Sequence, residues 1–108
     1  MVDITKKFLN DIDIVSEEII EDEDKGYFVI FLCQKIINKY IDENNGSILE
    51  TIKIFIKIYN DNNNFIKYIS LLCIYITELR IGKTKKDEYI IKNSLVEINQ
   101  IIKKIDEM

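Results

Sequence analysis

The chain has 108 residues, of which 47% are hydrophobic and 31% are charged, and its formal net charge is -4. This composition is far from that of a disordered chain, and the length suits one folding unit, so we expect a single helical domain over residues 1–108. The acidic balance argues against a dedicated nucleic-acid binder, which normally presents a strongly basic face.

Two amphipathic helices are expected in the first part of the chain. The first begins after Asp3, a favourable N-cap, and ends in an acidic run at residues 21–24. Its apolar stripe, at steps of three and four, consists of Ile4, Phe8, Ile12, Val15 and Ile19. The second helix covers about residues 27–42 and stops before Gly46. Its inward residues are expected to be Phe28, Phe31, Leu32, Ile36 and Tyr40.

Residues 51–59 form an ambiguous segment, because they are β-branched and partly alternating, as a strand would be. We expect a helix there for two reasons. Ser47 and Glu50 have the spacing of a capping box, and a lone strand would have no partner elsewhere in the chain. The helix would place Ile48, Ile52, Phe55, Ile56 and Tyr59 on its apolar face, opposite a polar stripe of Glu50, Lys53 and Lys57.

The C-terminal part predicts two more helices. Residues 65–81 are apolar nearly all the way round, as in a buried central helix, and Gly82 is expected to close that helix as its C′ residue. Thr84 with Asp87 is expected to start the last helix, whose apolar seam is Ile91, Leu95, Ile98, Ile102 and Ile105. Short connections favour antiparallel neighbours, so the expected fold class is all-α, an antiparallel four- to five-helix bundle.

Membrane insertion and secretion are both unexpected. The longest apolar runs, at residues 27–33 and 71–76, are far shorter than the ~18 residues that span a bilayer. Acidic and amide residues interrupt the first fifteen positions, unlike a secretory signal, so we expect a cytoplasmic protein. Cys33 and Cys73 lie in apolar stretches and are expected to be buried free thiols, with a disulfide between two helices as the alternative.

The chain contains no histidine, which bears directly on its chemistry. This removes the commonest general base, the Ser-His-Asp and Cys-His systems, and most zinc sites. Gly82-Lys83-Thr84 looks like the end of a phosphate-binding loop, but Thr77 stands where that loop requires a glycine. We therefore expect no enzyme activity, no cofactor and no metal site.

Two groups of charged residues are the candidate partner-binding residues. The acidic group consists of Glu17, Glu18, Glu21, Asp22, Glu23 and Asp24. Residues 1–24 carry nine acids and two lysines, a charge of -7, so the acidic group could steer a basic partner. The basic group consists of Arg80, Lys83, Lys85 and Lys86 and could contact a phosphate or an acidic partner. A solvated surface and a helix-capping cluster, respectively, are the alternatives.

The opening Phe8-Leu9-Asn10-Asp11-Ile12, followed by an acidic turn and a long second helix, is similar to a known pattern. Together with the chain length, it resembles, over residues 4–80, the small cytoplasmic immunity proteins that protect bacteria from class II (pediocin-like, enterocin A-type) bacteriocins. The resemblance implies an antiparallel four-helix bundle that acts by protein contact and without catalysis. It also implies that the C-terminal part governs which bacteriocin is recognised.

The expected function is that of a non-catalytic protein-binding domain, with immunity or inhibition as the leading role. It would neutralise a toxin, or a complex of a toxin with its receptor, by direct contact. For a cationic toxin such as a nuclease, the acidic group would mimic phosphate charge. The alternative is a small structural subunit of a larger assembly, for example a nucleoprotein complex, or a self-associating bundle, because the fourth helix has more apolar surface than one face buries.

Overall fold

The computed structural model describes residues 3–19 and 25–108, and the regular structure in these two ranges is entirely α-helical. The helices are α1 (Ile4–Glu17), α2 (Lys25–Glu43), α3 (Ile48–Asp61), α4 (Phe65–Lys85) and α5 (Glu88–Asp106). The predicted all-α bundle is therefore confirmed, with five helices in the described part of the chain. The second helix starts two residues earlier than expected, at Lys25.

Short polar residues fix the starts of the helices. Asp3 is the N-cap of α1, as predicted, and its carboxylate accepts hydrogen bonds from the backbone N–H groups of the first turn. Ser47 caps α3 by accepting from the Glu50 N–H at 3.2 Å, which confirms half of the expected capping box. The Glu50 carboxylate does not form the other half of the capping box, because it pairs with the Lys53 ammonium at 3.4 Å.

The ambiguous segment 51–59 is helical, and its buried polar residue shows how a β-branched run is accommodated. Thr51 is fully buried in α3, and its hydroxyl donates to the Ser47 carbonyl at 2.8 Å, so it carries no unsatisfied group into the core. Phe55 and Ile58 lie on the same face of α3 and are also buried. The 3.6-residue period therefore prevails over the strand propensity of the individual residues.

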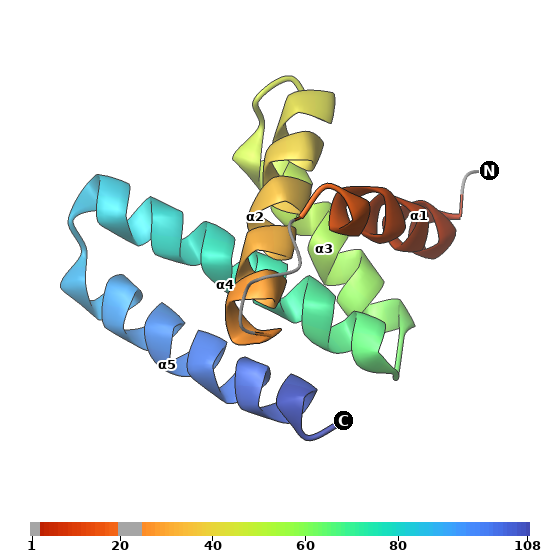
Figure 1. Ribbon diagram of the computed structural model, residues 1–108. Coiled ribbons are helices and arrows are strands. Elements are labelled where there is room, and N and C mark those ends of the chain that lie inside the picture. Colours follow the sequence, from red (N-terminus) through yellow and green to blue (C-terminus); the bar gives the residue numbers. More distant parts are fainter. Residues whose placement is uncertain (1–2, 20–24) are drawn as a thin grey trace.

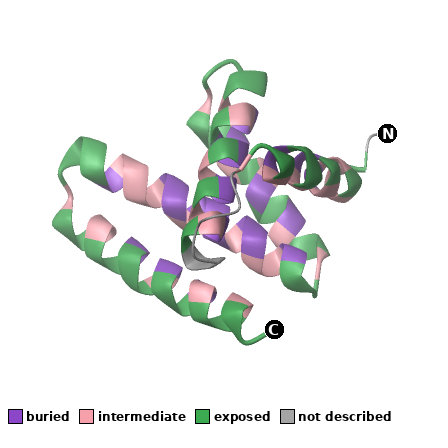
Figure 2. Cartoon of the chain, viewed as in Figure 1, coloured by how far each residue is buried: buried purple, intermediate pink, exposed green. Residues whose placement is uncertain are grey.

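Helix α4 is the central element of the bundle. It packs most extensively against α5 on one side and α3 on the other, and α2 crosses it (Figure 1). Helices α4 and α5 run side by side in opposite directions, while α1 packs on α2 and α3. Buried residues cover more than half of the circumference of α4, as expected of a central helix, whereas the outer side of α5 is exposed (Figure 2). None of the helices in the described ranges combines the length and the apolar character needed to cross a bilayer.

The core joins all five helices through aliphatic and aromatic side chains. Three aromatic rings meet where α1, α2 and α3 converge: Phe8 lies edge-on to both Tyr40 and Phe55, and Tyr40 stacks on Phe55 at 5.4 Å between ring centroids. Deeper in the bundle, Cys33 of α2 and Cys73 of α4 are fully buried and are not joined by a disulfide, which confirms the prediction of free thiols.

The predicted end of the fourth helix was wrong. Helix α4 continues through Gly82 and Thr84 to Lys85, and the left-handed C-cap is Lys86, with a φ of 57°. Gly82 is buried inside the helix because α5 approaches it closely: a Cβ at this position would lie 2.8 Å from Cγ2 of Ile90. Asp87 alone caps α5, and the Thr84 hydroxyl instead donates to the Arg80 carbonyl.

Some side chains expected to face the core are exposed. Phe31, Ile48, Ile56 and Leu95 are each between 41% and 44% exposed. The residues that replace them inward are offset by one to three positions, such as Val29 and Cys33 in α2, Thr51 and Ile58 in α3, and Ser94 in α5. These helices have more apolar residues than one face can hold. The periodicity alone therefore did not determine which of them point into the core.

Candidate partner-binding surface

The described part of the acidic group lies at the end of α1. Glu17 is the last residue of that helix and Glu18 is its C-cap, and both side chains are exposed. Glu18 faces α2, where its carboxylate lies 3.8 Å from the Lys35 ammonium. The other members, Glu21, Asp22, Glu23 and Asp24, lie outside the described residues.

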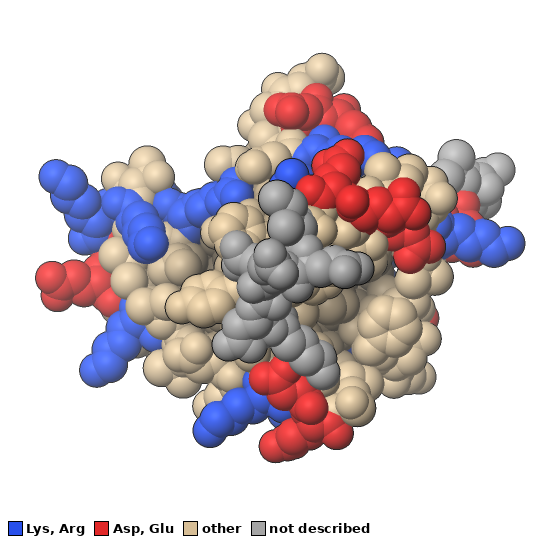
Figure 3. Space-filling model, viewed as in Figure 1, with Lys and Arg blue, Asp and Glu red and all other residues tan. Residues whose placement is uncertain are grey.

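The basic group occupies the last turns of α4. Lys83 and Lys85 are exposed in the last turn, where their charge complements the helix dipole, and Lys86 follows as the cap. Arg80 is half-buried, and its guanidinium donates to the Asn38 side chain of α2 at 2.7 Å. Figure 3 shows basic side chains gathered at the end of the molecule where α4 passes into α5. The basic group and Glu17 and Glu18 are thus separated on the molecule (Figure 1).

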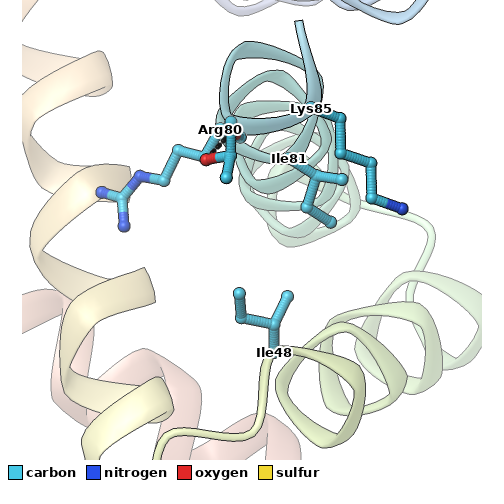
Figure 4. A pocket seen from close by; sticks show the side chains of 5 residues that line it. Ile48, Arg80, Ile81 and Lys85 are labelled. Atoms are coloured by element: carbon cyan, nitrogen blue, oxygen red, sulfur yellow. Dashed lines mark hydrogen bonds between the residues drawn. The ribbon is translucent and has the colours of Figure 1, made fainter. Parts of the chain in front are cut away.

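A pocket opens directly beside this basic group, between α4 and the start of α3. It has a volume of about 230 Å³ and is lined by Ile48, Arg80, Ile81, Thr84 and Lys85. In Figure 4, Ile48 and Ile81 face each other across it, while Arg80 and Lys85 extend to opposite sides. The pocket therefore has an apolar interior with a positive charge on each flank.

Two further pockets continue this surface onto α5. The first, of about 340 Å³, shares Ile81 with the pocket just described and is lined by Glu78, Ile81, Tyr89, Ile90 and Asn93. The second, of about 310 Å³, is lined by Tyr89, Lys92, Asn93 and Val96. Each pocket shares at least one lining residue with the next, so the three adjoin on the surface that runs from the start of α3 to the third turn of α5. We call these three pockets the basic groove.

The basic groove combines apolar exposure with positive charge. Tyr89 is 79% exposed and Val96 is 46% exposed, so both present apolar surface to solvent. Three cations line the groove, Arg80, Lys85 and Lys92, and Glu78 is the one acid among its described lining residues. A surface of this kind suits a ligand that has an apolar face and a negative charge.

The structure also contains a buried ionic cluster that the sequence reasoning did not identify. Asp11 of α1 is 4% exposed, and its carboxylate accepts hydrogen bonds from Lys7 and Lys39, each at 2.8 Å. Lys7 also bonds Glu43 at 2.9 Å and lies 4.2 Å from the centre of the Tyr40 ring. A signal was present in the sequence, because Asp11 is spaced three and four residues from the buried Phe8 and Val15.

The proton affinities in this cluster follow from burial and from the pairing. Burial alone would raise the pKa of the Asp11 carboxyl, but the hydrogen bonds from Lys39 and Lys7 outweigh it and leave the pKa below the ordinary 3.8. Burial opposes the charge of Lys7, yet its bonds to Asp11 and Glu43 raise the Lys7 pKa above 10.5. Burial, and then the Asp11 carboxylate, raises the pKa of the Tyr40 hydroxyl. Asp11 and Lys7 are therefore ionised at neutral pH, and their bonds to Lys39 and Glu43 tie α1 to α2.

The other chemically active side chains of the described residues are dispersed or enclosed. No three of the cysteine, aspartate and glutamate side chains in the described ranges gather so that they could hold a metal ion. The Cys33 thiol lies 4.0 Å from the Ile69 carbonyl. Burial, and then the neighbouring Cys33 thiol, raises the pKa of Cys73 well above 9.0. A thiol with a raised pKa is a poor nucleophile, because the thiolate is the reactive form.

The basic groove contains Arg80 and Lys85 of the predicted basic group, whereas Lys83 and Lys86 are not among its lining residues. The sequence did not predict the contribution of Ile48, Tyr89 and Val96, because their proximity to the basic group depends on how α3 and α5 pack on α4. Comparisons of the chain with models of protein families, with curated proteins and with solved structures gave no match.

Proposed function

We propose that this chain is a non-catalytic, cytoplasmic protein-binding domain that neutralises a toxin, or a complex of a toxin with its receptor, by direct contact. The observation that supports binding is the basic groove, in which exposed apolar side chains lie between positive charges. The toxin role is supported by the similarity of the opening residues 8–12 to bacteriocin immunity proteins. A catalytic role is not proposed, because the chain has no histidine and its cysteines are enclosed.

The binding role can be tested with two neighbouring residues of α5. Val96 lines the groove and is 46% exposed, whereas Leu95 is 44% exposed and is not among the groove residues. Immobilised wild-type protein and the variants Val96→Glu and Leu95→Glu would be compared for capture of proteins from a lysate of the source organism. We expect one protein captured by the wild type and by Leu95→Glu but lost with Val96→Glu, because a buried charge opposes docking. Capture that Val96→Glu leaves unchanged would refute the groove as the binding surface.

The toxin role requires a separate experiment. A strain sensitive to pediocin-like bacteriocins would express the wild-type chain, Val96→Glu or Leu95→Glu, and would then be challenged with a panel of those bacteriocins. We expect the wild type and Leu95→Glu to raise survival against at least one toxin and Val96→Glu to give none. If no variant protects while the groove still captures a partner, the chain binds a protein but immunity against this class is wrong.

A second candidate, a structural subunit or self-associating bundle, is favoured by one observation. Leu49 is 63% exposed at the start of α3 and Tyr89 is 79% exposed at the start of α5, so each presents apolar surface that a second chain could cover. Sedimentation velocity over a range of concentrations distinguishes the two candidates. A concentration-dependent dimer or larger species supports self-association, and a monomer at all concentrations argues against it.

A further inference from the structure

We propose that the basic groove receives an acidic amphipathic helix of the partner protein, with the apolar face of that helix on the groove and its carboxylates beside the flanking cations. This inference rests on the proposed protein-binding function and specifies the chemistry of the bound segment. The argument has three parts, which concern the shape of the groove, its charge, and the surroundings of its arginine.

The shape of the groove suits a row of side chains from one helix. Three adjoining pockets of about 230, 340 and 310 Å³ follow one another from Ile48, past Ile81, to Val96. Side chains on one face of an amphipathic helix recur every three or four residues, and such helices dock by placing these anchors in successive apolar pockets. The exposed Tyr89 and Val96 lie on one face of α5 at a spacing of seven residues, with Lys92 and Asn93 between them, and offer two apolar contacts to the bound helix.

The charge of the groove selects an acidic segment. Arg80 and Lys85 flank the first pocket and Lys92 lines the last, so cations lie at both ends of the groove, with Glu78 at the middle pocket. Lys83 and Lys86 are exposed on the adjoining turn, and together with Lys85 they outnumber the acids Asp87 and Glu88 that follow. A basic segment would meet like charges at both ends, whereas carboxylates at the edge of the bound helix would be attracted there.

Arg80 is oriented before any partner arrives. Its bond to Asn38 holds the guanidinium between α2 and α4 and uses one of its N–H donors. A guanidinium has five N–H donors in a planar fork, which suits a carboxylate. The loss of side-chain entropy on binding is smaller for a residue that is already held in place.

The test uses two synthetic probes and the intact chain. The first is an 18-residue fluorescent peptide with leucines at helical spacing and glutamates on the remaining face, and the second replaces every glutamate by lysine. Fluorescence anisotropy at low and moderate salt would measure their affinity. We expect the glutamate peptide to bind, with weaker binding at higher salt, and the lysine peptide not to bind.

Variants assign the binding to the groove. The double variant Lys85→Glu and Lys92→Glu should weaken the glutamate peptide about tenfold, mainly by slowing association. The matched control, Lys53→Glu with Lys57→Glu on the polar stripe of α3, should change it little. Circular dichroism would check that each variant folds, and Lys85→Gln with Lys92→Gln provides a milder change that should weaken binding by a smaller factor.

Each of the following results would overturn the proposal of an acidic helix. No binding of the glutamate peptide, equal binding of the lysine peptide, or equal effects of the groove and control variants would each refute the acidic helix. Binding of vesicles rich in phosphatidylserine, lost with the groove variants while the peptide fails to bind, would assign the groove to a lipid surface. A dimer disrupted by the same variants would assign it to a second copy of the chain. If the peptide fails but Val96→Glu still abolishes capture of a protein, the binding function holds and only the chemistry of the bound segment is wrong.

Discussion

Asp11 should contribute more to the stability of the fold than an exposed acidic residue does. Its carboxylate is buried and bonded to both Lys7 and Lys39. Replacement by the isosteric asparagine removes the negative charge between the two ammonium groups, but Lys7 keeps its bond to Glu43 and both lysines are more than a third exposed and can be hydrated again. We therefore expect Asp11→Asn to lower the free energy of unfolding by about 2 kcal/mol, below the range for fully buried pairs.

Urea unfolding followed by circular dichroism would measure this loss. Asp13→Asn is the matched control, since Asp13 is exposed on the same helix two residues away. Its unfolding midpoint should stay within the usual small range of surface substitutions. A similar loss in both variants would mean that the ionic cluster contributes no specific stability.

The same cluster predicts a dependence of stability on pH. Because the pKa of Asp11 is lower in the folded protein than the ordinary 3.8, its contribution is fully present above that value and is lost as pH falls through the folded pKa. The pKa of Lys7 is raised above 10.5, so its contribution is lost only as pH rises beyond that value. The difference in unfolding free energy between the wild type and Asp11→Asn should thus be constant from about pH 5 to pH 9 and shrink below pH 3.8. A difference that shrinks near neutral pH would contradict this assignment.

At the scale of elements, Gly82 sets how closely α5 approaches α4. A methyl group there would meet Cγ2 of Ile90 at 2.8 Å and Cγ1 of Ile91 at 3.2 Å. Alanine favours a helix over glycine by about 1 kcal/mol, but overpacking of this kind costs about 1–3 kcal/mol. We expect Gly82→Ala to lower the thermal midpoint, and the added change Ile90→Val to leave the clash in place because Cγ2 is retained. In an Ile90→Ala background, which lacks that methyl group, Gly82→Ala should lower the midpoint less than it does in the wild type. An unchanged or higher midpoint for Gly82→Ala alone would contradict the close packing.

The cap of α4 offers a prediction of opposite sign. Lys86 has a φ of 57°, a left-handed conformation in which a side chain is strained and glycine is not. Lys86→Gly should therefore raise the free energy of unfolding by about 0.5 kcal/mol. Lys83→Gly, three residues earlier within the helix, should lower it by about 1 kcal/mol. Chemical denaturation of the two variants tests the assigned end of α4. If the helix ended at Gly82, Lys83 would lie outside it, and neither the gain with Lys86→Gly nor the loss with Lys83→Gly would be expected.

The helices could be predicted from sequence, whereas their ends and orientations could be predicted only in part. Asp3 and Ser47 were identified as caps because their effect is local. Gly82 was misassigned because its role depends on Ile90 of the next helix, and not on its own neighbours in the chain. Phe31 and Leu95 were placed inward because isoleucine-rich helices offer more apolar residues than one face can bury.

The candidate surface was harder to predict for the same reason. Arg80 and Lys85 are marked by their charge, but Ile48 is far from them in sequence and joins them only through the packing of α3 on α4. Asp11 was read as part of a family pattern, although its buried position follows from the spacing of Phe8 and Val15. The composition of the groove and the burial of Asp11 both depend on contacts between helices, and not on the properties of single residues.

At the scale of the whole molecule, the buried thiols report on global unfolding. Cys33 and Cys73 are fully enclosed between α2 and α4, and burial raises the pKa of Cys73. We expect neither thiol to react with an aromatic disulfide reagent in the native protein, and both to react together in urea as the bundle unfolds. Labelling followed by mass spectrometry would show no singly modified species of appreciable abundance. Rapid labelling of one cysteine without denaturant would instead indicate local opening of α2.

The order of packing along the chain has a consequence for the speed of folding. The most extensive helix contacts, α3 with α4 and α4 with α5, join elements that follow one another directly. Only short loops must close before such pairs can form, so little chain entropy is lost in the search for partners. Helical proteins dominated by contacts between neighbours in the chain fold within about microseconds to milliseconds. This bundle should therefore pass from the unfolded to the folded state quickly, and its apolar α4 should be unprotected only briefly.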